Sequence, residues 1–378
     1  ARDNYSVSLN LVQPLYKGGT IAAGLRAARY FEVLTDESVR RVTQNTILNT
    51  VQAYYDVLLA QKLVEVQRAS LEFARSNRDD VKALVEAEAG IPFDLLRAEV
   101  EVSNVEADLI RQQNALDQAR TELFRVMGIS QRSDLTLVSN QALDFIAVDR
   151  SYVAAVRTAF SNRPELSVGE LDVRLQEEFL NTLESRYYPN LEGFVQQAWS
   201  RPAPDTTSGW GNDWIAGLRL RWSLFDGLLR EGQIIQQEAT IRQRKISLAE
   251  AEQGILAELT NVLLELGNAT KLVRSQRLNE ERAREALRLV KTRVREGVAT
   301  RLEVLDARAA WTRAAGLHFE ALHQHASARL ALERALGTLG AEDVETERGD
   351  ADVEMEGADM GGSPREETTE TDRKDQEQ

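Results

Sequence analysis

Three histidines are the residues of this chain best suited to bind a transition metal: His318, His323 and His325. A zinc or copper site needs ligands that converge on one point. If this segment is helical, His318 and His325 stand one heptad, or about 10 Å, apart along the axis. The chain has no cysteine that could add a thiolate ligand. We therefore expect His318 and His325 to pack in a helical seam, and we expect no metal and no cofactor.

No other set of residues forms a catalytic or phosphate-binding motif. Gly18-Gly19 is too short for a phosphate-binding loop, and neither GxxxxGK[ST] nor GxSxG occurs. Thr300 and Glu303 have the spacing of a capping box, in which the two side chains bind backbone N–H groups where a helix begins. Most other carboxylates alternate with arginine and lysine, as on solvated helix surfaces. The sequence therefore predicts a protein that is not an enzyme.

The net charge of −14 is concentrated at one end of the chain. Residues 341–378 contain 15 acidic and four basic side chains, whereas residues 1–340 contain 45 and 42. The 341–378 tail has almost no large apolar residues, so we expect it to be disordered. The body is nearly neutral and has no basic patch, which argues against a nucleic-acid partner. No run of 18 apolar residues occurs, so the sequence predicts no transmembrane helix.

An internal repeat at a constant offset of 209 residues organises the chain. Residues 62–64 read Lys-Leu-Val, as do residues 271–273, and Asp94 falls on Glu303. Residues 163–199 precede the second copy, and their first-copy counterparts would lie before the first residue. We therefore expect the chain to begin part-way through its first repeat, without one helix and one strand.

Alternating polar and apolar residues predict three β-strands, at residues 5–13, 191–199 and 214–223. The last two strands flank residues 200–213, which are rich in proline, glycine and aspartate and so predict a hairpin loop. Tryptophans lie near one end of these strands, at Trp199, Trp210 and Trp214. This pattern fits the strands of a membrane barrel with an aromatic girdle. A half-buried sheet on a soluble domain would account for the alternation equally well.

Each copy then continues into a very long helix, predicted at residues 18–88 and 227–296, of roughly 100 Å. Apolar residues recur at heptad spacing along these helices and along the helices that return from them, as at Leu95, Val102 and Leu109. A strict heptad repeat imposes left-handed supercoiling of paired helices. The sequence thus predicts two long antiparallel hairpins, which need each other and further copies of the chain to cover their seams.

The sequence resembles the TolC family of bacterial outer-membrane efflux proteins over residues 5–340. The matching motifs are LVQPLYKGG from Leu11, NTVQAYYDVLLAQ from Asn49, REGVATRLEVLDA from Arg295 and ERALGTLG from Glu333. The tandem duplication is a further point of resemblance.

The resemblance implies a mainly α fold with a small β part. Tandem-repeat antiparallel hairpins would form a trimeric periplasmic α-barrel, and the strands would join a shared 12-stranded β-barrel in the outer membrane. We accordingly divide the chain into a truncated first-repeat barrel strand (1–17), a first hairpin with its equatorial linker (18–160), a connecting helix (161–188), a barrel hairpin (189–224), a second hairpin (225–340) and the acidic tail (341–378).

The function implied by the resemblance is that of a passive exit duct of a tripartite efflux or secretion system in a Gram-negative bacterium. The expected partners are two further copies in a homotrimer, a periplasmic adaptor, an inner-membrane pump and outer-membrane lipid. The alternative, from a different class of protein, is a soluble coiled-coil scaffold or a periplasmic adaptor. A scaffold has no reason to carry alternating strands in both repeats, which favours the duct.

The resemblance also places a periplasmic gate at the acidic residues after the second hairpin turn. These are Glu303 and Asp306, and Asp94 is the first-copy match of Glu303. Three copies on one axis would concentrate negative charge and favour cations. Arg97 stands at the first-copy position of Asp306, and Gly90 lies closer to Asp94 than Gly297 lies to Glu303. We expect Gly90 and Gly297 to serve turn geometry. By family analogy, the adaptor would dock at the tips, on Gly90, Ile91, Pro92, Gly297, Val298 and Ala299.

Overall fold

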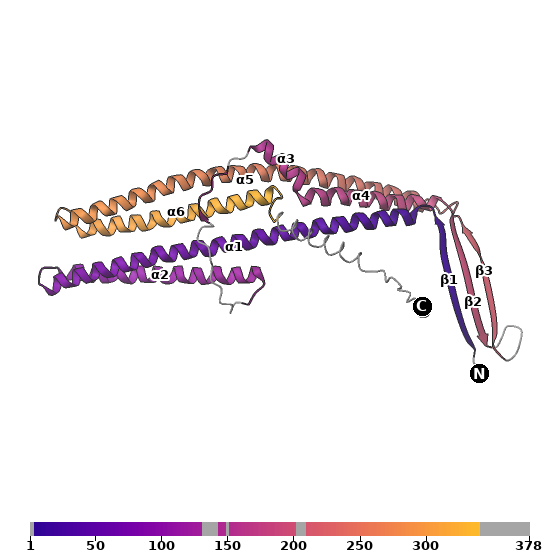
Figure 1. Cartoon of the computed structure of the whole chain (residues 1–378), viewed down its shortest axis with the longest axis horizontal. Coiled ribbons are helices and arrows are strands. Elements are labelled where there is room, and N and C mark those ends of the chain that lie inside the picture. The colour runs from indigo at the N-terminus through magenta and orange to yellow at the C-terminus, as the bar shows by residue number, and fades with distance from the viewer. Residues whose placement is uncertain (1–3, 131–142, 149–150, 202–208, 341–378) are drawn as a thin grey trace, which may run out of the picture.

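Two long helical hairpins lie side by side, and a three-stranded sheet extends from one end of them (Figure 1). The computed structural model describes residues 4–130, 143–148, 151–201 and 209–340. The predicted acidic tail and half of the predicted loop between the second and third strands, residues 202–208, lie outside the described residues.

Hairpin 1 consists of α1 (Thr20–Glu86) and α2 (Pro92–Met127), and hairpin 2 consists of α5 (Leu229–Arg295) and α6 (Arg301–Ala335). Adding 209 to the bounds of α1 gives the bounds of α5, so the structure confirms the repeat that the sequence indicates. None of the described helices contains a stretch of 18 residues that is both apolar and uncharged enough for a transmembrane span.

The strand-to-helix junctions are also repeated. Gly18 and Gly19 precede α1 with positive φ angles of 59° and 97°, and Gly227 and Leu228 precede α5 with φ angles of 73° and 69°. A Cβ on Gly18 would lie 2.3 Å from the carbonyl oxygen of Ser185, so glycine is required there by a close backbone contact as well as by φ. Both junctions therefore turn the chain by the same left-handed geometry.

The hairpin turns differ between the copies, and turn geometry requires Gly90 and Gly297 in different ways. The left-handed residue of the second turn is Gly297, at φ 75°, whereas its first-copy equivalent is Glu88, at φ 56°. Gly90 does not have a positive φ. It is needed because a Cβ there would approach the backbone nitrogen of Val85 to 2.9 Å. The first turn is therefore built on an unusual conformation of a non-glycine residue.

Small and branched residues bury the seams within each hairpin, as the heptads predict. In hairpin 1, Ala98, Val102 and Val105 are buried, and the last two pack against Leu71 and Ala74 of α1. In hairpin 2, alanines at heptad spacing form a buried seam at Ala314, Ala321, Ala328 and Ala335. Supercoiled helices approach closely where such small residues face one another.

Two further helices connect the hairpins, α3 (Tyr152–Asn162) and α4 (Pro164–Glu184). The sequence predicts one helix at 161–188, but Pro164 begins α4, and Arg163 before it is extended at ψ 119° because proline disfavours a helical conformation in the preceding residue. The side chain of Arg163 is 3% exposed, and its Nε donates a hydrogen bond of 2.8 Å to the carbonyl oxygen of Ala335. Its Nη2 lies 2.6 Å from Oε2 of Glu258 on α5, an ion pair that is not aligned for a hydrogen bond.

A group of polar residues connects α1, α5, α6 and the segment between α3 and α4. We call Arg40, Arg163, Glu258, Arg334 and Gly337 the polar joint. Arg40 of α1 donates to the carbonyl oxygen of Asn162 at 3.0 Å, and Arg334 lies 3.6 Å from Glu258. Gly337, at φ 73°, lets the end of α6 approach the backbone of Asn162 so closely that a Cβ would lie 2.7 Å from its oxygen. Residues from α1, α5, α6 and the α3–α4 connection therefore meet at one place.

The sequence predicted seam packing for His325, and the structure confirms it. His325 is 1% exposed, its ring lies 4.8 Å from that of Phe145, and its Nε2 has no hydrogen-bond partner among the residues that the structure describes. Burial, with a smaller contribution from the positive charge of Arg329, lowers the pKa of His325.

His325 should therefore make folding sensitive to acid. Its pKa is lower in the folded state, so as pH falls below about 6.5 the unfolded chain binds the proton first and the free energy of unfolding falls. Replacing His325 with Leu should reduce the loss of stability between pH 7 and pH 5, measured as the shift in urea midpoint by circular dichroism. An unchanged shift would show that His325 does not contribute to it.

The sheet has the order β1–β2–β3, with both neighbouring pairs antiparallel. The strands are β1 (Tyr5–Lys17), β2 (Asn190–Arg201) and β3 (Gly211–Arg221), each near its predicted position. β1 continues past the predicted end through an irregularity between Pro14 and Tyr16.

Candidate functional site

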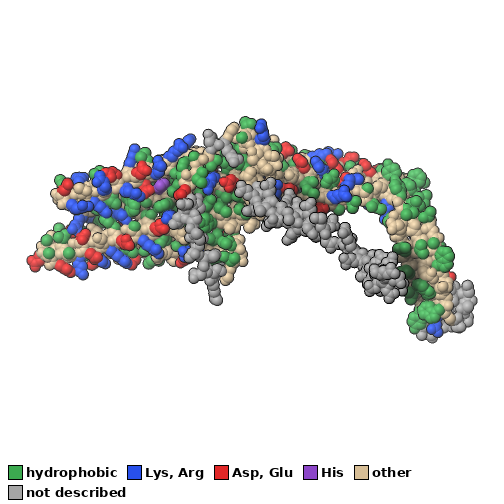
Figure 2. All heavy atoms as spheres, viewed as in Figure 1, with side chains coloured by type: hydrophobic (Ala, Val, Ile, Leu, Met, Phe, Trp, Pro, Cys, Tyr) green, Lys and Arg blue, Asp and Glu red, His purple; other side chains and the backbone are tan. Residues whose placement is uncertain are grey.

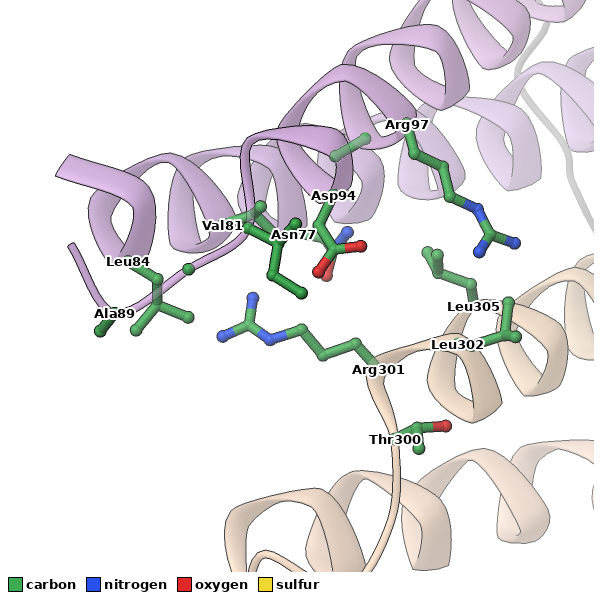
Figure 3. A pocket seen from close by; sticks show the side chains of 13 residues that line it. Asn77, Val81, Leu84, Ala89, Asp94, Arg97, Thr300, Arg301, Leu302 and Leu305 are labelled. Atoms are coloured by element: carbon green, nitrogen blue, oxygen red, sulfur yellow. The ribbon is translucent and has the colours of Figure 1, made fainter. Parts of the chain in front are cut away.

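The two hairpin turns meet around a cavity of about 390 Å³ at the end of the molecule farthest from the sheet. Hairpin 1 contributes residues of α1, of its turn and of α2, and hairpin 2 contributes Thr300, Arg301, Leu302 and Leu305. Figure 3 shows the carboxylate of Asp94 and the guanidinium of Arg301 reaching into this cavity from opposite hairpins. The structure therefore brings Asp94 close to the start of α6, as the matching repeat positions suggest.

Glu303 forms the predicted capping box at the start of α6. Its Oε1 accepts hydrogen bonds from the backbone nitrogen of Thr300 at 3.0 Å and from its hydroxyl at 3.1 Å, while Thr300 Oγ1 accepts from the backbone nitrogen of Glu303 at 3.4 Å. Arg293 of α5 lies 3.6 Å from Oε2. The bond from the backbone of Thr300 is the main reason that the pKa of Glu303 is lowered.

Asp306 is placed differently from Glu303. It lies one turn further along α6 and is exposed, and in the described part of the chain it takes part in no hydrogen bond or ion pair. Asp94 is also exposed, in the first turn of α2, where a carboxylate is favoured by the positive end of the helix dipole. Of the three acidic residues, Asp306 is therefore the one whose charge is least compensated by neighbouring groups.

Sequence reasoning did not single out Arg301 as a residue of the site. It is the first residue of α6, and together with Arg97 it lines the tip cavity with positive charge opposite Asp94. The sequence did contain a sign of positive charge at this cavity, because Arg97 stands where the second copy has the acidic Asp306. Arg301, in contrast, has no counterpart motif that could have identified it.

The residues predicted as docking tips lie at the outermost part of both turns. Ile91 is 63% exposed and Val298 is 64% exposed, and Pro92 and Gly297 are also exposed. Gly90 and Ala299 are only partly exposed. Large apolar side chains therefore stand in solvent at both turns.

The sheet at the opposite end has one mainly apolar and one mainly polar face, because residues paired in register lie on the same side. Leu9 and Leu11 of β1 share a face with Val195 of β2 and with Trp214 and Leu218 of β3, and these side chains are between 47% and 72% exposed. The opposite face carries Ser6, Ser8, Asn10, Gln196, Asp213 and Arg219, with the exposed apolar Val12 and Ile215 among them. Figure 2 shows hydrophobic side chains gathered over the sheet and mixed charges over the helices.

The three histidines do not converge on a metal site. Nδ1 of His318 lies 2.6 Å from Oε2 of Glu280 on α5, and Nε2 of His323 lies 2.6 Å from Oδ1 of Asp56 on α1. The predicted seam packing of His318 was therefore incomplete, since its ring also binds a carboxylate. Among the described residues, no group of three or more histidine, cysteine, aspartate or glutamate side chains is arranged to hold a metal ion.

A family model described as outer membrane efflux protein matches residues 1–129 and 155–338. Proteases secretion protein PrtF of Dickeya chrysanthemi is 25% identical over 350 residues, which span 90% of this chain and 74% of that protein. Outer membrane protein TolC of Vibrio cholerae is 22% identical over 353 residues, which span 90% of this chain and 78% of that protein.

Solved structures show the same fold at lower sequence identity. The structure of CusC, a transmembrane channel, superposes with a TM-score of 0.74 at 16% identity and covers 88% of this chain and 78% of that one. The MtrE outer membrane channel of Neisseria gonorrhoeae, in its open state, superposes with a TM-score of 0.71 at 16% identity, covering 89% and 81%.

Proposed function

Because the chain belongs to the outer membrane efflux protein family, a family of channels and not of enzymes, we propose that it is the exit duct of a tripartite efflux or secretion system. Substrates would pass through it without any bond being made or broken. The observation that carries this proposal is the two-faced sheet at one end of a pair of hairpins whose turns meet at the other.

The sheet would insert into the outer membrane with its apolar face toward lipid. Burying Leu9, Leu11 and Leu218 in hydrocarbon removes apolar area from water, which is favourable at about 25 cal/mol per Å². The polar face would then line an aqueous passage.

A homotrimer would supply hydrogen-bond partners for the backbone groups at the two edges of the sheet. β1 and β3 are the edge strands of the described sheet, and within the described part of the chain each pairs only with β2. Unpaired edge strands are templates for pairing with another chain, and they are especially costly in lipid. Pairing of the edges of neighbouring copies would also bring their hairpins together as a helical tube.

The helix tips would form the gate and the docking surface. In a trimer, three copies of Asp306, with Glu303 and Asp94 nearby, would surround the narrow end of the tube. The exposed Ile91 and Val298 would contact a periplasmic adaptor, which would link the duct to an inner-membrane pump. Apolar anchors within a polar rim are typical of such contacts.

Recording single-channel currents from the full chain in planar lipid bilayers, with its mass measured in detergent, would test this proposal. The duct should form long-lived channels and have the mass of three copies. A folded, helical oligomer that stays in aqueous solution without detergent and carries no current would instead support the scaffold.

A further inference from the structure

The two hairpins are joined by few polar contacts near their tips. The last ion pair between them is Asp56 with His323, at 2.6 Å. Beyond it, residues 57–127 and 270–322 are all described, and no hydrogen bond or ion pair connects hairpin 1 to hairpin 2 within them. This part of α6 is about 30 Å long. Some other contact must therefore keep the two hairpins together there.

One aromatic ring of hairpin 1 receives two cations of hairpin 2 in this region. Lys291 Nζ of α5 lies 5.0 Å from the centre of the Phe73 ring, and the guanidinium carbon of Arg308 of α6 lies 5.2 Å from it. Arg308 also lies 4.4 Å from the ring of Trp311. Distances below about 6 Å give favourable cation–π attraction. We call Phe73, Lys291, Arg308 and Trp311 the Phe73 latch.

The aromatic rings are the principal partners of the Arg308 guanidinium. Its Nε and Nη2 are buried and have no hydrogen-bond partner among the described residues, and the same is true of Trp311 Nε1. Burial lowers the pKa of both Arg308 and Lys291, and the charges of Arg308 and Arg295 lower that of Lys291 further. A desolvated cation without an acceptor interacts more strongly with an aromatic face than a hydrated one does. The cation–π attraction in the latch is therefore stronger than it would be on an open surface.

The latch lies beside spaces lined by both polar and apolar side chains. Cavities of about 250 and 370 Å³ adjoin Phe73, the first bordered by α2 and the second by α5. Polar side chains such as Gln67 and Asp80 line these spaces, and the seam residues Ala74 and Val105 border the first. Loss of the latch would therefore open spaces that are already partly polar and hydratable, which lowers the cost of separating the hairpins there.

We propose that the Phe73 latch sets how far the two hairpin tips separate and, through this, how readily the helical end of the duct opens. Phe73 lies 13 residues, or about 20 Å, before the end of α1, so a small change at the latch is amplified at the tips. The part of this inference that concerns opening rests on the proposed function. The part that concerns tip separation does not.

The absence of cysteine allows spin labels to be attached at introduced cysteines alone. Ile91→Cys and Val298→Cys place one label on each tip, and both positions are exposed. We expect a narrow distribution of intramolecular distances by pulsed electron resonance, in samples diluted with unlabelled chain. Phe73→Leu, which keeps an apolar side chain but removes the ring, should broaden and lengthen this distribution. Arg308→Met should do the same.

Matched variants separate the latch from general packing. Phe73→Tyr keeps the aromatic face and should behave as the unsubstituted chain. Arg313→Met removes a cation that lines the same cavity as Arg308 but contacts no aromatic ring of the described residues, and it should also leave the distances unchanged. Circular dichroism spectra and melting curves would show that each variant is folded.

In bilayers, Phe73→Leu and Arg308→Met should raise the ratio of open to closed time by about threefold to tenfold, the range expected for loss of a partly desolvated cation–π contact. Unchanged tip distances and open times in both variants would overturn the inference. An Arg313→Met effect as large as that of Arg308→Met would do so as well. If the unsubstituted chain carries no current, the proposed function fails, and the spin-label distances still decide whether the latch exists.

Discussion

Replacing Asp306 with Asn is expected to reduce the cation preference of the channel by about fourfold or more. A unit charge about 5 Å from a passing ion in a water-like dielectric changes the free energy of that ion by about 0.8 kcal/mol, and each such change is about a factor of four. A trimer would remove three charges together. The reversal potential of single channels in asymmetric salt measures this preference. Asparagine preserves the size of the side chain, so the change tests charge alone.

Glu303→Gln is the informative comparison, because its effect should be smaller. The amide oxygen of glutamine can still accept the bonds from Thr300, so the capping box persists. In the unsubstituted chain the Glu303 carboxylate is already engaged by Thr300 and lies 3.6 Å from Arg293, and these partners reduce its field in the pore. If the reversal potential changes in Glu303→Gln and not in Asp306→Asn, then Glu303, and not Asp306, is the residue that sets the cation preference.

Replacing Arg163 with Ala is expected to destabilise the fold by about 3 kcal/mol. The change removes the hydrogen bond to Ala335 and leaves Glu258, 37% exposed, with the more distant Arg334 as its one ion-pair partner in the described part of the chain. Because Arg163 is 3% exposed whereas Glu258 is partly solvated, the main cost is the loss of the buried hydrogen bond to Ala335, and the charge left on Glu258 adds a smaller one. The shift in denaturation midpoint, multiplied by its slope, gives the free energy.

The matched control for this prediction is Arg174→Ala, since Arg174 is an exposed arginine of α4. Its effect should stay within about 0.5 kcal/mol. Glu258→Gln combined with Arg163→Ala should recover part of the loss by removing the uncompensated charge. If both arginine variants have the same midpoint, the polar joint does not stabilise the fold.

Much of this architecture could be predicted because it follows from periodic patterns. Heptads fix which residues of α2 and α6 face their partners, and alternation fixes the two faces of the sheet. The offset of 209 residues carries the helix bounds of one copy to the other. Such patterns are local in sequence and repeat many times, so a single exception does not obscure them.

The interactions that could not be predicted depend on single contacts between distant segments. Gly90 is required by the backbone of Val85. The left-handed residue of the turn is Glu88, and glutamate rarely adopts a positive φ angle. In the sequence, Arg163 is an ordinary residue before a proline, and nothing near it indicates that it contacts α5 and α6 in the fold. Phe73 is the only aromatic residue of α1 beyond Tyr55, but nothing in its neighbours indicates that two cations of hairpin 2 contact it.

The matched lengths of the two hairpins have a consequence for how this chain can evolve. α1 and α5 each contain 67 residues, and α2 and α6 contain 36 and 35. Inserting one heptad into each arm of a single hairpin would advance its turn by about 10 Å, the diameter of a helix, while the other turn stayed in place. The turns would then no longer meet. Insertions and deletions in one half must therefore be compensated at the equivalent place in the other, so the duplicated halves share one length although their side chains have diverged.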